Sequence, residues 1–439
     1  MIFRDAMRSL KDDPAHTFFY LLTFFITTMF MFLFFNIAEC EMAVNQDIIM
    51  ADLGNAGEYM ANGDIANVLS IYVVVLCCVD IIFANRFFIR NKAPELAVRM
   101  ICGAAFTQMT AYLFLQTTVL LLIALPLGIL AGAALIPVLN RILAVYLSSP
   151  FTVTITSGAI VKFTAILVTV LFWTTTLNLS YVYQNEASKI LNGMGEETDK
   201  EGSAFGSLLK KIPGFLKGIA GIVLFLLPLS EFIKAPGSAA LWVIVGMLGL
   251  EMMVSNALLP GITKVMKKKA LKIPVKAVVL GLLRDDFTKM KITLYLFIGN
   301  AVLLTALLVS RMDNASAQLL IVVTYAVMNF LQAMTIMFHL QTLLSSRNNE
   351  FHVLDQLGFS KKQCFSAIRK EMIWFHVLVG GTALLYMAVL LTALVTRGVF
   401  TAVSSFLMIL VMLVPLLIAG IISFFIYRKA IQVRVAEGQ

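Results

Sequence analysis

Charged residues are scarce in this sequence, and those present are not gathered into a polar domain. Asp, Glu, Lys and Arg make up 13% of the 439 residues, whereas hydrophobic residues make up 60%. A soluble protein needs a charged surface that this composition cannot supply. The net charge of +9 comes from short basic clusters between apolar runs, the pattern of cytoplasmic loops in membrane proteins. We therefore expect no nucleic-acid binding, and we expect the basic clusters to face membrane lipids and a partner protein.

Signatures of metal and nucleotide binding are also missing. The five cysteines are scattered, and their spacing fits neither a metal site nor a disulfide framework. No Gly-x-x-x-x-Gly-Lys-Ser/Thr loop, the element that cradles phosphates in many ATPases, occurs anywhere in the sequence. The chain is therefore expected not to be an enzyme and to bind no cofactor. Any ATP and Mg²⁺ would be bound by a separate partner subunit.

What the sequence has in abundance is long apolar runs. A helix needs about 20 apolar residues to cross the hydrocarbon core, and ten segments qualify. The length and continuity of these segments predict helices rather than barrel strands, so the expected fold is an all-α polytopic membrane protein. The predicted spans are 18–38, 68–88, 111–136, 161–183, 215–233, 239–259, 292–310, 319–343, 373–395 and 402–427.

The distribution of Lys and Arg predicts the orientation. The dense run Lys264–Lys276 and most other basic residues fall on one set of connections. The positive-inside rule assigns these connections to the cytoplasm. Both termini are then cytoplasmic, and the expected location is the bacterial cytoplasmic membrane.

A repeated pattern follows the second and eighth predicted spans. Polar residues and glycines recur at a constant separation of 255 residues, which is improbable by chance. The sequence thus predicts two parallel four-helix repeats (1–183 and 291–439), a linker (184–214), an inserted hairpin (215–259) and a basic segment (260–290). The matching pairs are Glu95 with Glu350, Gly103 with Gly358, Gln108 with Gln363, and Gln116 with Glu371.

Each copy predicts a short interfacial helix that ends in a turn. Leu96, Val98 and Ile101 alternate with charged residues, which suits a helix lying at the membrane surface or against a partner. Gly103 and Gly358 are expected to supply the positive φ that ends such a helix. Gln116 and Glu371 then mark the positions where the chain re-enters the membrane.

The first copy, Glu95-Leu-Ala-Val-Arg-Met-Ile-Cys-Gly103-Ala104, resembles the signature of the FtsX-like permease family. The order of four, two and four spans is similar to that of the bacitracin-export (Bce) type within this family. The resemblance implies the membrane subunit of an ABC transporter, working with a cytoplasmic ABC ATPase dimer and, as a further partner, a sensor histidine kinase. One departure is that Bce-type permeases carry a large extracellular domain between the seventh and eighth spans, where this chain has only residues 311–318.

The resemblance makes the repeated elbows the candidate ATPase-coupling sites, since charge pairs at such a rim set register with a partner. The alternative is a solvated interfacial turn without a partner. The candidate positions are Arg90, Lys92, Glu95, Arg99, Gly103, Arg347, Glu350, Gly358, Lys361 and Lys362.

Acidic residues mark two further regions. Segment 39–67, predicted to be an outside loop, contains acidic residues but no Lys or Arg, so it could concentrate a cationic peptide or be an ordinary soluble connector. Within the predicted spans, Asp80 and Glu251 each cost about 2.5–3.5 kcal/mol to insert and are expected to face protein, water or a partner. The acidic residues of segment 39–67 are Glu39, Glu41, Asp47, Asp52, Glu58 and Asp64.

The resemblance implies a permease subunit that expels or dislodges peptide or amphipathic antibiotics by mechanotransmission, in which helix motion replaces passage through a central channel. The alternative is a signalling subunit that resembles FtsX itself and transmits the state of the ATPase to an extracytoplasmic partner or sensor kinase without moving cargo.

Overall fold

The long apolar runs fold into α-helices in the computed structural model, and no strand occurs among the residues that it describes. Helices satisfy every backbone polar group within one segment, as a lipid environment requires. The all-α polytopic fold class is confirmed. The described residues are 2–12, 14–51, 56–146, 152–184, 214–234, 239–270, 274–310 and 315–437.

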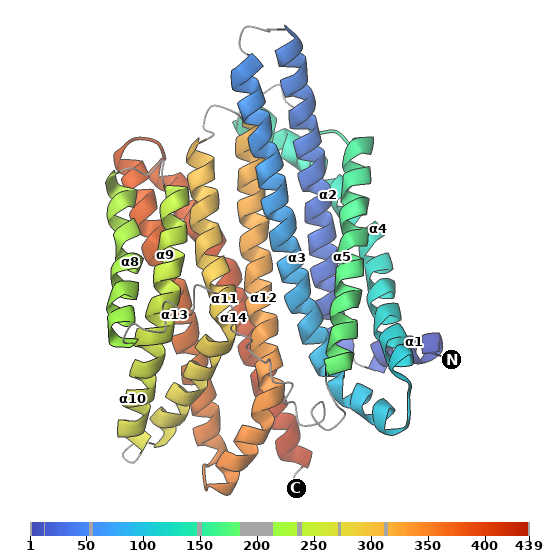
Figure 1. Ribbon diagram of the computed structural model, residues 1–439, viewed down its shortest axis with the longest axis vertical. Helices are drawn as coiled ribbons and strands as arrows, with labels where there is room; N and C mark the ends of the chain where they lie inside the picture. Colours follow the sequence, from blue (N-terminus) through green and yellow to red (C-terminus); the bar gives the residue numbers. More distant parts are fainter. Residues whose placement is uncertain are drawn as a thin grey trace. The chain divides into compact units, whose positions relative to one another are not determined.

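The chain divides into two compact units, residues 1–195 with 311–331 and residues 196–310 with 332–439. The first unit contains α1 (Ile2–Asp12), α2 (Pro14–Ala51), α3 (Ala56–Ile101), α4 (Phe106–Tyr146) and α5 (Ser157–Gln184) (Figure 1). The second contains α8 (Gly214–Lys234), α9 (Ala239–Met253), the π-helix η3 (Val254–Leu258), α10 (Leu259–Ala270), α11 (Pro274–Ser310), α13 (Lys361–Thr396) and α14 (Ala402–Glu437). Helix α12 (Ala315–Gln356) contributes residues to both units. The boundaries of the two sequence repeats remain predictions, and the predicted linker lies almost wholly outside the described residues.

Nine helices in the described part of the chain are long and apolar enough to cross a membrane, against ten predicted spans. The tenth predicted span, 68–88, lies within the 46-residue helix α3, and several of its side chains lie outside the described residues. A tenth crossing by α3 remains a prediction.

The predicted outside loop at 39–67 is wrong as a description of the backbone. Helix α2 continues to Ala51 and α3 begins at Ala56, so most of this segment is helical. The reason is local: Ala, Met and Glu are frequent here, and these good helix formers prolong the helices beyond the apolar run. Figure 1 shows α2 and α3 extending together past the ends of α4 and α5 within the first unit.

Small residues allow close helix packing in the first unit. A Cβ on Gly128 of α4 would lie 2.1 Å from Thr28 Oγ1 of α2, and one on Gly132 would lie 2.7 Å from Phe32. This small-xxx-small spacing is a common way for membrane helices to approach closely. The position of α4 against α2 therefore depends on both glycines.

A buried polar chain joins three helices of the first unit. Tyr20 of α2 donates a hydrogen bond to Asn85 of α3 at 2.8 Å, and Asn85 donates to Asn178 of α5 at 2.6 Å. Buried polar groups of this kind need partners. This series of hydrogen bonds fixes the relative register of α2, α3 and α5.

In the second unit, the α8–α9 hairpin is joined to α13. Gly221 of α8 and Gly249 of α9 lie where any Cβ would clash with the backbone of the other helix. Tyr386 of α13 donates a hydrogen bond to the carbonyl of Phe225 in α8. Arg397, just after α13, donates to carbonyls at the end of α8, where helix carbonyls lack intrahelical partners.

Candidate coupling site

The two sequence-related elbows have the same backbone geometry. Gly103 follows α3 with φ +86°, and Gly358 follows α12 with φ +85°. The prediction that these glycines supply a positive φ is confirmed. A left-handed glycine directly after a helix is the usual way to end it and redirect the chain.

The hydrogen bonds around the two glycines also correspond, at the same separation of 255 residues. In both elbows a bond reaches back five residues over the glycine, as in the Schellman motif, and a glutamine side chain caps the start of the next helix. In the first elbow the bonds are Cys102 N to Val98 O, Ala104 N to Arg99 O, Gln108 N to Ala105 O, and Ala105 N to Gln108 Oε1. In the second they are Leu357 N to Val353 O, Phe359 N to Leu354 O, Gln363 N to Ser360 O, and Ser360 N to Gln363 Oε1.

Both elbows expose apolar side chains beside their glycines. Val98 and Val353, which correspond to each other, are 55% and 52% exposed, and Leu357 is 69% exposed. Ile101 is likewise exposed on the first elbow. Each elbow therefore presents exposed aliphatic side chains close to its glycine turn.

Helix α1 packs on the first elbow. Ala6 of α1, Leu96 of α3 and three residues of α4 form one buried apolar cluster (Ala6, Leu96, Met109, Tyr112 and Leu113). Ala6 is fully buried, whereas Arg4 and Arg8 are exposed. The apolar side of this short helix therefore faces the elbow and its charged side faces outward.

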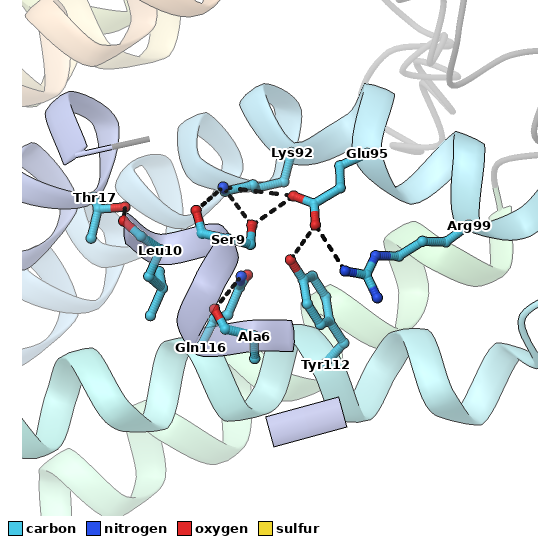
Figure 2. Close-up of polar contacts among 9 residues, drawn as sticks. All are labelled: Ala6, Ser9, Leu10, Thr17, Lys92, Glu95, Arg99, Tyr112 and Gln116. Carbon is cyan, nitrogen blue, oxygen red and sulfur yellow. Dashed lines mark hydrogen bonds and ion pairs between the residues drawn. The ribbon is translucent and has the colours of Figure 1, made fainter. Parts of the chain in front are cut away.

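Glu95 joins α1, α3 and α4 at this elbow (Figure 2). Its Oε2 accepts a hydrogen bond from Ser9 Oγ at 2.6 Å, and its Oε1 accepts from Tyr112 Oη at 2.6 Å and from Arg99 Nη2 at 3.0 Å. Charge-assisted hydrogen bonds of this length are among the stronger ones in proteins. The Arg99 guanidinium also lies 4.3 Å from the centre of the Tyr112 ring, a favourable cation–π distance.

Lys92 completes the network. It is buried, and its Nζ donates to the carbonyl of Ser9 at 2.9 Å and to Ser9 Oγ at 2.8 Å, with Glu95 Oε2 3.7 Å away. The carbonyl of Ser9 lies in the last turn of α1, where an ammonium group also complements the helix dipole. Gln116 of α4 adds a longer hydrogen bond to the carbonyl of Ala6 at 3.3 Å.

These contacts set the ionisation of Glu95. Burial alone would raise the pKa of its carboxyl group. The hydrogen bonds from Ser9 and Tyr112, the nearby Lys92 ammonium and the bond from Arg99 together outweigh burial, and the pKa of Glu95 lies below its ordinary value. Glu95 is therefore a carboxylate at neutral pH.

The structure thus gathers Lys92, Glu95, Arg99 and Gln116 into one network, but it directs Lys92 and Glu95 toward α1. Sequence reasoning missed Ser9 and Tyr112, since neither has a counterpart in the second copy that would have drawn attention to it. Among the remaining candidate positions, Lys362 is exposed on α13 and Glu371 is fully buried. The side chains of Arg90, Arg347, Glu350 and Lys361 lie outside the described residues.

Of the six acidic side chains in the predicted loop 39–67, the structure describes one, that of Glu39. Glu39 of α2 forms an ion pair with Lys162 of α5 at 2.6 Å. Nearby, Asn36 accepts a hydrogen bond from the backbone of Thr156 at 2.9 Å. This end of the first unit therefore contains a paired carboxylate. The side chains of Glu41, Asp47, Asp52, Glu58 and Asp64 lie outside the described residues.

The two acids that lie within predicted spans differ in their surroundings. Asp80 of α3 is buried, and it has an interaction partner within the protein. Glu251 of α9 is exposed on the surface of its helix. Among the described residues, no group of three or more His, Cys, Asp or Glu is arranged to hold a metal ion.

Comparison with known protein families found one match. Residues 67–181 match the family described as FtsX-like permease C-terminal, about a quarter of the chain. The match contains the Glu95 network residues of α3 and α4, the Gly103 turn and most of α5. A search of curated proteins found no match. Residues 67–181 therefore resemble an FtsX-like permease domain, within a chain whose described part has nine helices long and apolar enough to cross a membrane; proteins of that family generally work with a cytoplasmic ATPase.

Proposed function

We propose that this permease subunit couples a cytoplasmic ABC ATPase dimer to movement of helices across the membrane, and that this movement dislodges peptide or amphipathic antibiotics. The observation that carries the proposal is the pair of matching elbows at Gly103 and Gly358. Two equivalent elbows are what a dimeric motor would need, one for each of its subunits. The proposal places both termini and both elbows on the cytoplasmic side.

The length of α3 supports mechanical transmission. Its 46 residues correspond to about 69 Å at 1.5 Å per residue, more than twice the roughly 30 Å hydrocarbon core. The elbow lies directly after one end of α3, and the helix continues for many residues beyond its apolar stretch at the other end. A displacement at the elbow would therefore be carried along one continuous helix to the opposite side.

Glu95 gives the elbow stiffness. Because Lys92, Ser9 and Tyr112 bind it from three helices, α1 and the start of α4 would move together with α3. The docking function then belongs to the exposed aliphatic side chains of each elbow, Val98 on the first and Val353 on the second, with the Glu95 network as the internal support of the first elbow.

The exposed valines allow a direct test. Val98→Asp combined with Val353→Asp is expected to lower co-purification of the ATPase at least about tenfold, because a carboxylate in an apolar contact costs more than a lost methyl group. Ile155→Asp is the matched control, since Ile155 is also exposed but directly precedes α5 and belongs to neither elbow. Unchanged ATPase stoichiometry in the double variant would refute elbow docking.

The projecting ends of α2 and α3 favour a second candidate, a signalling subunit that acts on an extracytoplasmic protein or a sensor kinase. The two candidates differ in their response to cargo. For the transporter we expect cationic peptides to stimulate ATP hydrolysis and a deletion strain to lose resistance. For the signalling subunit we expect peptide-independent hydrolysis and unchanged resistance.

A further inference from the structure

Glu251 is exposed at the middle of a membrane-crossing helix. The candidate span runs from Leu241 to Lys268, so Glu251 is about 15 Å along the helix from its first residue. This places the carboxylate near the centre of a hydrocarbon core of about 30 Å. A charge at this depth is costly and usually marks a functional contact.

The exposed side chains around it form one stripe. Leu241, Ile244, Leu248 and Glu251 are all exposed, and their spacing of three, four and three residues places them on one face of α9. Val243 and Leu250, on other faces, are buried. The stripe has the width that a single packed helix would cover.

Two features surround Glu251 at the same depth. The π-helix η3 begins three residues later, where Leu259 N–H bonds to the carbonyl of Val254. Such wide turns recur at functional sites. Tyr295 of α11, a helix packed against α9, has a buried hydroxyl that makes no hydrogen bond to any described residue, and the Glu251 carboxylate is close enough to act on it electrostatically.

The chemistry of this face selects its occupant. Lipid headgroups and peptides bound at the membrane surface stay near the interface, about 15 Å from Glu251. A second copy packed symmetrically through this face would bring two Glu251 carboxylates together, which is unfavourable. A basic side chain presented by another membrane helix matches both the depth and the charge.

We propose that the exposed face of α9 binds a transmembrane helix of a partner protein, which presents a Lys or Arg side chain to Glu251. This contact is separate from ATPase docking at the elbows, and it does not depend on the cargo proposed above. Polar contacts between membrane helices contribute enough that their loss weakens association about fivefold to thirtyfold.

Photo-crosslinking in native membranes tests this contact. A photoreactive residue at position 248 is expected to give a discrete protein adduct, and one at buried position 250 is not. The captured protein should carry a Lys or Arg within its membrane span. Glu251→Gln should lower the adduct about fivefold to thirtyfold, and Glu231→Gln, which alters a partly exposed carboxylate of the same hairpin, should not. Glu251→Lys paired with Glu at the partner's basic position should restore the adduct.

Several results would overturn the proposal: lipid adducts only, an adduct with a second copy of this chain, a partner without a basic residue in its span, or an adduct that is insensitive to Glu251→Gln. If Glu251→Gln fails to accumulate, Ile244→Trp changes the same face without removing the charge. It should lower the adduct by a similar factor, and an undiminished adduct would also count against the contact. Co-purification of the ATPase should be normal in these variants, which separates failure here from failure of elbow docking.

Discussion

Replacing Glu95 by Gln should release α1 from the first elbow. Gln keeps the shape but removes the charge that Ser9, Tyr112 and Arg99 contact, and it leaves the buried Lys92 ammonium without its carboxylate. Hydrogen bonds to charged groups contribute about 1.5–3 kcal/mol when buried. Because the Glu95 side chain is 32% exposed, water compensates part of this loss, and we expect a net cost of about 2 kcal/mol.

Hydrogen exchange of α1 measures this cost. A loss of about 2 kcal/mol in the free energy of local opening corresponds to about 30-fold faster amide exchange. The control is Glu231→Gln, because Glu231 forms only an ion pair with the exposed Lys234, and such pairs contribute about 0–1 kcal/mol. Ser9→Ala should cost less in Glu95→Gln than in the unmodified protein, because the charge-assisted Ser9–Glu95 hydrogen bond is already lost and only the contact of Lys92 Nζ with Ser9 Oγ remains to be removed. Two results would refute the conclusion that Glu95 holds α1 on the elbow. One is unchanged amide exchange of α1 in Glu95→Gln; the other is an equal change of α1 exchange in Glu95→Gln and Glu231→Gln.

Three further outcomes follow from particular contacts. Gly103→Ala should destabilise the protein by about 1–2 kcal/mol, because φ is positive at this position; no clash adds to the cost, since nothing lies close to the new Cβ. The control is Gly381→Ala, at an uncrowded glycine within a helix, which should stabilise the protein by about 0.5–1 kcal/mol. Thermal unfolding measures the sign of both changes. Tyr386→Phe should cost about 1 kcal/mol and raise protease sensitivity of the α8–α9 hairpin, whereas Tyr427→Phe, which loses a similar bond to a carbonyl of α12, should leave the hairpin protected. The pKa of Glu95 is lowered on folding, so the contribution of Glu95 to stability is complete above the ordinary pKa of a glutamic acid and is lost as pH falls through the lower pKa of the folded state. The amide exchange of α1, corrected for intrinsic rates, should therefore stay constant from pH 5 to 8 and rise only in more acidic buffer.

The membrane class and the elbows could be predicted because they depend on local properties of the chain. Apolar runs of 20 residues determine helices that cross a bilayer, whatever their neighbours are. A glycine in a repeated position after a helix favours a positive φ on its own, and Gly103 and Gly358 adopt it. The helical extension of α2 and α3 was missed because the acidic residues of 39–67 were given more weight than the helix propensity of their neighbours.

The direction in which a side chain points depends on contacts distant in sequence, and these required the tertiary structure. From sequence, Glu95 and Lys92 are two charges on an interfacial helix, available to a partner. In the folded chain Ser9 and Tyr112, 86 and 17 residues away, bind Glu95 and enclose the charges. Likewise, sequence placed Asp80 and Glu251 within predicted spans, with Glu251 the deeper of the two, and packing buried the first and exposed the second. The sequence alone determined which segments are apolar enough to enter the lipid and where the chain turns, because hydropathy and backbone preference are local properties. Only the packing of the helices decided which charged side chains are bound within the protein and which remain available to other molecules, because that depends on the neighbours of each helix.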